Sequence, residues 1–221
     1  VKDLVSKNNL SREISLKTLY NNGLRIYTTQ DPDIQKCIDE VFKDKKYFPK
    51  LEGGSDSPQG AMVVMDPYTG EVKGIVGGAG EKSADLVLNR ATSTLATKRP
   101  GSSIKPIAVY APAIEAGVVT PASVIDDIPT YIGNYHPENY DKTYRGLTSI
   151  RDAIVSSINV VAVKTWLKLG ADNSVNFLKN LGITTLTRDD RYAAMALGGL
   201  TNGVTVHEMT AAYAAFANKG I

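Results

Sequence analysis

The sequence predicts a globular chain of mixed helices and strands, and three observations support this prediction. The 221 residues are 43% hydrophobic, 22% charged and 7% aromatic, which is typical of a folded domain and not of a disordered chain. Residues 61–77 place a turn sequence between two runs of strand-forming residues, as a hairpin does. Helical patterns, three of which end at glycines, then recur along the chain after residue 102.

Charge and residue counts exclude several classes of protein. The 25 Lys and Arg residues exceed the 23 Asp and Glu residues by only +2, which gives no charge excess for following a nucleic-acid backbone, so we expect no nucleic-acid partner. Cys37 is the only cysteine and the two histidines lie far apart, so the zinc-finger and HExxH metal patterns are absent. No run of 18 apolar residues occurs, so we expect a soluble chain without a membrane span.

The first 57 residues are polar and rich in lysine, and they predict two helices around one strand. Residues 11–20 can form a short helix, and the β-branched and aromatic residues of segment 24–29 predict a strand. The second helix is expected to start at Pro32, with Asp31 as its N-cap. Its apolar stripe is expected to contain Ile34, Cys37, Ile38 and Val41.

A linker and a hairpin follow these elements. Residues 51–60 are rich in Gly, Ser and Pro, which predicts a loop and a domain boundary near residue 58. Residues 61–65 are expected to form a strand, residues 66–70 the turn and residues 71–77 the returning strand. Because the first strand is apolar throughout, we expect it to be covered on both faces.

Helices dominate the rest of the predicted fold. One helix is expected from about residue 102 to residue 116, ended by Gly117, and residues 120–147 are expected to be mostly irregular. Shorter helices are expected at roughly 149–156, 160–169 and 173–180. The capping box Thr205-x-x-Glu208 predicts a last helix that runs to about Asn218.

The sharpest chemical signal is the pair Ser102-x-x-Lys105, which follows Gly101. Residues three apart share a face of a helix, so the Ser hydroxyl and the Lys amine can meet. A serine is a poor nucleophile until a base takes its proton, and a lysine can be that base only when burial removes its charge. The plainer interpretation makes Ser102 an N-cap and Lys105 a solvated charge.

A second candidate motif is Ser157-x-Asn159, about 55 residues further along the chain and between two helical patterns. Its hydroxyl could relay a proton, and its amide can both donate and accept hydrogen bonds. Taken alone it is better read as a polar helix junction with Asn159 as N-cap. Together with Ser102 and Lys105 it favours an acyl-transfer site.

At this point the sequence resembles a known family, the transpeptidase domain of class A (bifunctional) penicillin-binding proteins. The resemblance spans nearly the whole chain. Segment 23–29 is similar to the linker that leaves the glycosyltransferase domain, and segment 59–72 is similar to the first hairpin of the transpeptidase sheet. The remaining similar segments are 89–92, 99–106, 197–199, 203–205 and 211–218.

Residue roles follow from this resemblance by motif. It implies that Ser102 is the acyl-accepting nucleophile and Lys105 its base. Ser157 is implied to relay a proton to the leaving amine, and Asn159 to hold Lys105 and the substrate amide. The family's third motif, Lys-Thr/Ser-Gly on a strand, does not occur in the sequence, since Lys164-Thr165-Trp166 lies in a helical pattern and has Trp where Gly is needed.

The resemblance also implies an α+β fold of the penicillin-binding, serine β-lactamase-like type. This fold has an antiparallel sheet flanked by helices and a helical subdomain, and its C-terminal strands are expected to be absent from this chain. Residues 1–57 would be the linker region after a missing glycosyltransferase domain. Residues 58–221 would be the N-terminal and central part of the transpeptidase domain.

The implied function is D,D-transpeptidation of peptidoglycan stem peptides through a Ser102 acyl-enzyme, with no metal or organic cofactor. The expected partners are the stem pentapeptide, β-lactam antibiotics and the C-terminal remainder of the same protein, which would carry the third motif. The parent protein is expected to be anchored in the bacterial cell membrane, at its extracytoplasmic face.

Two alternatives remain at this stage. One is a β-lactamase or β-lactam sensor of the same fold, although the water-activating Glu that class A β-lactamases need after the second motif is not found. The other is a non-catalytic domain that binds wall peptide. The Tyr-rich loop 131–145 has two interpretations of its own. It could line a substrate groove through Tyr135, Asn139 and Tyr140, or it could be a packed surface loop.

Overall fold

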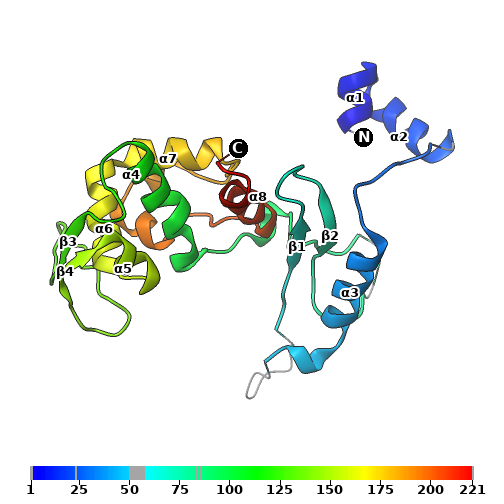
Figure 1. The fold of residues 1–221 in the computed structure, drawn as a ribbon. Coiled ribbons are helices and arrows are strands. Elements are labelled where there is room, and N and C mark those ends of the chain that lie inside the picture. Colours follow the sequence, from blue (N-terminus) through cyan, green and yellow to red (C-terminus); the bar gives the residue numbers. More distant parts are fainter. Residues whose placement is uncertain (1, 23, 50–57, 83, 85, 221) are drawn as a thin grey trace.

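The computed structural model describes residues 2–22, 24–49, 58–82, 84 and 86–220. It contains the helices and strands expected of an α+β chain (Figure 1). The helices are α1 (Lys2–Asn8), α2 (Arg12–Asn21), α3 (Pro32–Lys43), α4 (Ala111–Glu115), α5 (Ile150–Val155), α6 (Asn159–Leu169), α7 (Ala171–Asn180) and α8 (Val206–Ala217). The strands are β1 (Met62–Met65), β2 (Val72–Val76), β3 (Val124–Asp127) and β4 (Gly146–Ser149).

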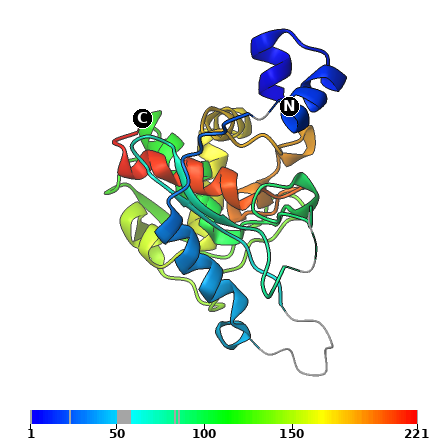
Figure 2. The same ribbon diagram turned by 90° about the vertical axis from the view of Figure 1, so that its right-hand side faces the viewer.

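The predicted hairpin is confirmed as the antiparallel pair β1–β2. It lies between α3, which packs on β2, and α8, which packs on β1 (Figures 1 and 2). Gly74 allows α3 to approach closely, because a Cβ at this position would lie 2.9 Å from Ile34 Cγ2. The expected burial of β1 holds only in part, since Val63 is buried and Met62 is 42% exposed at the strand's end.

Two predictions for the first 49 residues are wrong. Residues 24–29 form no strand, and Ile26 and Tyr27 are 71% and 87% exposed. β-Branched and aromatic residues favour a strand only where a neighbouring strand can pair with them. Among the described residues, segment 24–29 reaches the hairpin through a single hydrogen bond, from Thr29 Oγ1 to Val72 O. In α3 the buried row contains Ile38 and the half-buried Ile34, whereas Cys37 and Val41 are exposed.

Other local predictions are confirmed. The predicted helix over residues 11–20 corresponds to α2, and the predicted N-cap Asp31 caps α3 by accepting from the N–H groups of Asp33 and Ile34. The predicted helices near 149–156, 160–169 and 173–180 correspond to α5, α6 and α7. Helix α8 begins at the predicted capping box of Thr205 and Glu208. The predicted linker 51–60 lies mostly outside the described residues.

The central helical segment is continuous but changes its winding. A 3₁₀ turn (Gly101–Ile104) leads into a π-helical segment (Pro106–Tyr110) and then into α4. The prolines explain the irregularity, because neither Pro106 nor Pro112 has an N–H to donate to the preceding turn. The carbonyl of Ala108, four residues before Pro112, accepts instead from the buried hydroxyl of Ser174 in α7, at 2.6 Å.

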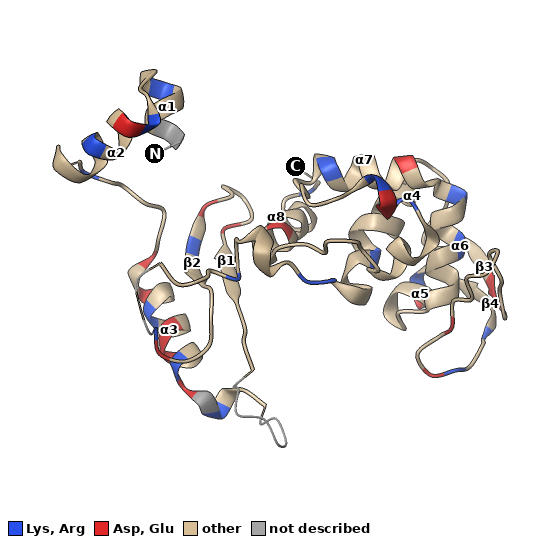
Figure 3. Ribbon diagram, turned by 180° about the vertical axis from the view of Figure 1, so that it is seen from behind, with Lys and Arg blue, Asp and Glu red and all other residues tan. Residues whose placement is uncertain are grey.

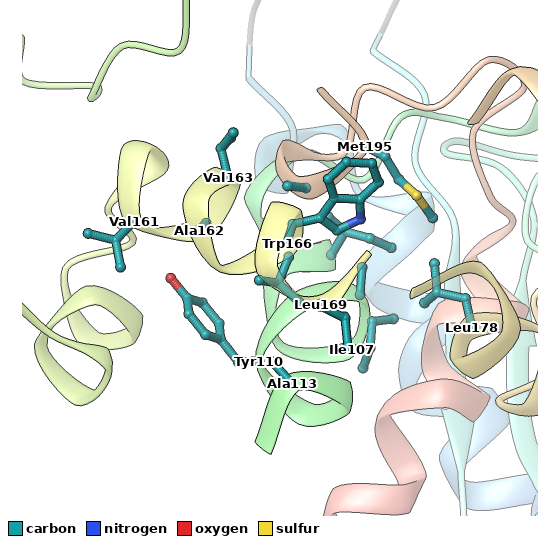
Figure 4. Close-up of a cluster of buried hydrophobic side chains, with 14 of the residues drawn as sticks. Ile107, Tyr110, Ala113, Val161, Ala162, Val163, Trp166, Leu169, Leu178 and Met195 are labelled. Carbon is teal, nitrogen blue, oxygen red and sulfur yellow. The ribbon is translucent and has the colours of Figure 1, made fainter. Parts of the chain in front are cut away.

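The main hydrophobic core surrounds this segment. Helices α6 and α7 pack against it, with Ile107, Val163, Trp166, Leu178 and Met195 among the buried side chains (Figure 4). Lys164-Thr165-Trp166 lies within α6, with Thr165 and Trp166 buried, so the prediction that this string is helix surface and core is confirmed. The core therefore fixes the position of the helical segment that begins at Gly101.

The expectation that residues 120–147 are mostly irregular needs correction at both ends. Strands β3 and β4 pair there, with Asp127 opposite Gly146, and residues 128–145 form the loop between them. Their four-residue length and the weak strand propensity of Asp and Gly hide the pair from sequence reasoning. The hairpin β3–β4 packs beside α5 and α6 and brings its loop to the start of α6.

Basic and acidic residues are interspersed over the helices, as Figure 3 shows along α3 and α7. Within the described parts of the chain, no helix is both long and apolar enough to cross a bilayer. Among the same residues, no group of three or more His, Cys, Asp or Glu side chains is arranged to hold a metal ion.

Candidate active site

Ser102 lies in the 3₁₀ turn that opens the central helical segment. Gly101 precedes it with φ +57°, a conformation that a side chain would strain, and the N–H of Lys105 donates to the Ser102 carbonyl. Because residues three apart eclipse each other in a 3₁₀ helix, this bond sets Ser102 and Lys105 on one face. The Ser102 side chain is exposed, and within the described residues its Oγ forms no hydrogen bond.

Neighbouring elements hold this turn from outside. The hydroxyl of Tyr213, on α8, donates to the carbonyl of Ser103 at 2.6 Å, and the Ser103 hydroxyl donates to Pro100 O at 2.7 Å. Arg99 Nε donates to Leu200 O at 3.0 Å. The turn that presents Ser102 is therefore fixed to α8 and to the segment around Leu200.

Lys105 is buried, with a side chain that is only 2% exposed. Its Nζ donates to Ser157 O at 2.6 Å, to Ser157 Oγ at 3.0 Å and to Asn159 Oδ1 at 2.6 Å. No carboxylate of a described residue lies within ion-pair distance of it. Burial therefore lowers the pKa of Lys105 to about 8, and the plain reading of this lysine as a solvated charge is wrong.

Ser157 lies at the junction between α5 and α6 in a strained conformation. Its φ is +51°, which is rare for a residue with a side chain and costs roughly 1–3 kcal/mol unless the surroundings enforce it. The Ile158 N–H closes the junction by donating to Ala153 O at 2.9 Å. This backbone turn aims both the carbonyl and the hydroxyl of Ser157 at Lys105.

Asn159 is the first residue of α6, and its side chain does not cap its own helix. Its Oδ1 accepts from Lys105, and its Nδ2 donates to Glu138 O at 2.8 Å. The β3–β4 loop thus binds the Nδ2 end of the side chain and Lys105 binds the Oδ1 end, so both ends of the Asn159 amide are held in place. The structure thus brings Lys105, Ser157 and Asn159 together through hydrogen bonds, with Ser102 joined to them by the turn.

The three loop residues predicted to contact substrate differ in their surroundings. Tyr140 is 99% exposed and Tyr135 is half-buried. Asn139 is buried, and both ends of its amide are already occupied within the protein. Its Oδ1 accepts from the N–H groups of Asn159 and Val160, so it serves as the cap of α6.

Sequence reasoning missed the residues that hold this site from behind. Tyr213 reaches the turn from α8, 110 residues away, and Asp127 contacts Asn139 from β3. Gly198 packs its backbone on Gly101. Periodicity carries no signal for these contacts, because each depends on how separate elements pack together.

Comparisons with known proteins point to one family. The family model described as the penicillin-binding protein transpeptidase domain matches residues 60–221. The chain is 38% identical to penicillin-binding protein 1A of Clostridium botulinum, over 91% of this chain and 26% of that protein. It is 34% identical to penicillin-binding protein 2a of Streptococcus pneumoniae, over 100% of this chain and 29% of that protein.

Solved structures are also similar. The crystal structure of penicillin-binding protein 1A from Haemophilus influenzae has a TM-score of 0.64 at 32% identity, over 72% of this chain and 23% of that one. The penicillin-binding protein PonA1 from Mycobacterium tuberculosis has a TM-score of 0.79 at 25% identity, over 100% of this chain and 55% of that one. The chain thus spans less than a third of the length of the curated relatives named above.

Proposed function

This chain belongs to the penicillin-binding protein transpeptidase family, and from that premise we propose that it contributes the nucleophile of a D,D-transpeptidase. One observation carries the proposal. Lys105 is buried, lacks a carboxylate partner among the described residues and sits one 3₁₀ turn from an exposed serine. A lysine with a pKa of about 8 is roughly one tenth neutral at pH 7 and half neutral at pH 8, and the neutral amine can accept a proton.

In the proposed acylation, Ser102 Oγ attacks the carbonyl carbon between the last two D-alanines of a peptidoglycan stem peptide. The hydroxyl proton passes to Lys105 Nζ as the new C–O bond forms. The C–N bond then breaks, and the leaving D-alanine takes a proton through the Ser157 hydroxyl, which lies 3.0 Å from Lys105 Nζ. The product is an ester on Ser102 and free D-alanine.

In the proposed second step, the amine of another stem peptide attacks this ester. The amine gives up a proton through the same Ser157–Lys105 pair, and the C–O bond to Ser102 breaks as the new amide forms. Asn159 holds Lys105 through its Oδ1 while its Nδ2 stays bonded to Glu138 O. The energy of the broken peptide bond is thus retained in the cross-link, and no cofactor enters the step.

A β-lactam would enter the first step as a substitute for the D-alanine pair. Ser102 would open the lactam ring, with the C–N bond breaking and the nitrogen taking the proton. The nitrogen stays attached to the acyl group, so it remains where the acceptor amine would attack. This retention explains why the acyl-enzyme would be long-lived.

We extend the proposal to the protein that contains this chain. The missing Lys-Thr/Ser-Gly motif would be supplied by the C-terminal remainder of the same protein, and residues 1–57 would link to a glycosyltransferase domain. Tyr135 and Tyr140 remain proposed substrate contacts. The whole protein would act at the extracytoplasmic face of a bacterial membrane, where stem peptides occur.

Labelling of the full-length gene product with a fluorescent penicillin tests the proposal. We expect stable labelling that Ser102→Ala abolishes and Ser103→Ala leaves in place. Nitrocefin turnover separates the alternatives, since a transpeptidase should consume about one equivalent and a β-lactamase many. Labelling that persists in Ser102→Ala, or rapid nitrocefin turnover, would contradict the proposal.

A further inference from the structure

Asp127 ends strand β3 with a fully buried carboxylate. Both of its oxygens accept from Asn139 Nδ2, at 2.9 and 3.0 Å, and one also accepts from the Arg145 backbone N–H at 3.0 Å. Among the described residues, no Lys, Arg or His lies within ion-pair distance of it. A buried carboxylate held only by neutral donors is expensive, so its surroundings must be kept in place.

Asn139 passes this restraint on to helix α6. Its Nδ2 is directed at Asp127 and at Thr143 O, which leaves its Oδ1 facing the start of α6. There the Oδ1 accepts from Asn159 N at 3.0 Å and from Val160 N at 3.2 Å. The carboxylate of Asp127 therefore decides which end of the Asn139 amide meets the helix, because only the NH₂ group can face a carboxylate.

The start of α6 is also the point from which Lys105 is held. Asn159 donates its backbone N–H to Asn139 and accepts from Lys105 Nζ with its side chain. Glu138, the neighbour of Asn139, supplies the carbonyl that fixes the other end of the Asn159 amide. An unbroken series of hydrogen bonds thus runs from Asp127 through Asn139 and Asn159 to Lys105.

We infer that Asp127 and Asn139 form a buried positioning pair that orients the Asn159 amide and, through it, the Lys105 amine. Neither residue touches the substrate in this account. The effect of this pair on acylation rests on the proposed function, whereas its effect on the orientation of the Lys105 amine does not.

The single substitutions break the pair in opposite ways. In Asp127→Asn, either orientation of the new amide sets one NH₂ group against a donor from Asn139 or Arg145. In Asn139→Asp, two carboxylates face each other across about 3 Å. The swap Asp127→Asn/Asn139→Asp restores a donor opposite an acceptor between the two side chains and keeps a carboxylate oxygen for the start of α6. It also sets the other carboxylate oxygen against Thr143 O, which accepts from Asn139 Nδ2 in the unchanged protein, so it should recover only part of what either single change loses.

The test compares these three variants with Asp126→Asn in the full-length gene product. Asp126 is a matched control because it neighbours Asp127 on β3 and contacts Lys164 only through its backbone carbonyl. We expect each single variant to slow penicillin acylation about tenfold or more, the scale of a displaced catalytic group, and the swap to recover part of this loss. The control should remain within twofold of the unchanged protein.

A second readout does not depend on acylation. In spectra of protein labelled with ¹³C at lysine Cε, assigned by Lys105→Arg, the Lys105 titration midpoint should fall in Asp127→Asn and return in part in the swap. Losing the Asn159 acceptor removes a bond that favours the ammonium form, which accounts for the direction.

The outcomes separate the two proposals. If the unchanged protein is acylated but Asp127→Asn matches Asp126→Asn in both rate and Lys105 titration, the positioning pair is wrong. If the unchanged protein is not acylated at all, the proposed function fails and the Lys105 titration alone decides the pair. If both single variants fail to fold, the folded swap decides: acylation and the Lys105 titration that move together support the pair, and unchanged acylation with a displaced Lys105 titration contradicts it.

Discussion

Gly198 lies with its backbone directly against Gly101, the residue before the proposed nucleophile. A Cβ at position 198 would stand 2.3 Å from the Gly101 carbonyl oxygen and 2.5 Å from its nitrogen. Both glycines also have positive φ angles, +84° and +57°. This contact between two backbones, 97 positions apart by their numbers, sets where the turn of Ser102 can begin.

Gly198→Ala should therefore damage both stability and acylation. The new methyl group must push the Gly101 backbone away, which displaces Ser102. Gly182→Ala is the matched control, since φ is +88° there and a Cβ would meet nothing within 4 Å. Both changes should cost more than about 1 kcal/mol of unfolding free energy through strain at positive φ. Only Gly198→Ala should also slow penicillin acylation, and equal acylation in the two variants would show that the contact does not position the turn.

The acylation rate should depend on the charge of Lys105. Its pKa is lowered to about 8 by burial, and only the neutral amine can take the Ser102 proton. The rate should thus rise about tenfold per pH unit below pH 8 and level off above it, as stopped-flow acylation across pH 6–10 would record. A rise centred near the ordinary lysine pKa of about 10.4 would exclude Lys105 as the base.

Replacing Lys105 by Ala should lower the acylation rate by about 10²–10⁴, the usual contribution of a positioned base. Lys168→Ala, an exposed lysine on α6, serves as the control and should leave the rate unchanged. The loss is to be measured on folded protein, verified by circular dichroism. A loss of tenfold or less would remove Lys105 from the role assigned to it.

Ser157 allows the hydroxyl and the backbone strain to be separated. Ser157→Ala removes the hydroxyl and keeps a Cβ at φ +51°, whereas Ser157→Gly removes both. The Gly variant should therefore be more stable than the Ala variant by about 1–2 kcal/mol in denaturant unfolding. Both should slow acylation less than Ser102→Ala does, because water can replace a proton relay but not the nucleophile. If Ser157→Ala were as inactive as Ser102→Ala, the assignment of Ser157 as a replaceable proton relay would be wrong.

Most of the elements could be predicted from local pattern, whereas the roles of the four motif residues were implied by the family resemblance and stay predictions. The spacing of hydrophobic residues, the glycines that end helices and the residues that cap them are all local features of the sequence. Helices α2, α3 and α5–α8 and the β1–β2 hairpin can therefore be predicted from them. The spacing of Ser102 and Lys105 likewise needs only one helical turn. The burial of Lys105 could be suspected but not deduced, because it depends on the junction at Ser157.

The features that escaped prediction depend on long-range packing. Residues 24–29 have strand propensity but no strand beside them, so they remain extended and exposed. The contacts of Asn139 with Asp127 and with the start of α6 also carried no local signal, since they join β3, the loop after it and α6. The winding of 101–115 reflects two prolines acting together with a hydroxyl from α7. Neither Asp127 nor the Ser174 hydroxyl is a sequence neighbour of the group that it contacts.

Replacing tyrosine by phenylalanine should affect stability differently at Tyr110 and at Tyr213. Tyr110 is 2% exposed, and among the described residues its hydroxyl has no hydrogen-bond partner. Tyr110→Phe should therefore leave stability unchanged or raise it, because it removes a buried polar group that is not paired. Tyr213→Phe removes the bond to Ser103 O and should cost about 1 kcal/mol. Thermal unfolding of both variants measures this, and a strongly destabilised Tyr110→Phe would contradict the assignment.

The central claim is that Ser102 accepts the acyl group. Its most direct test is intact-protein mass spectrometry of the full-length gene product after incubation with benzylpenicillin, followed by peptide mapping. The account predicts one penicilloyl adduct per chain, on the peptide that contains Ser102 and on that residue by fragmentation. No adduct, or an adduct on Ser103 or Ser157, would contradict it.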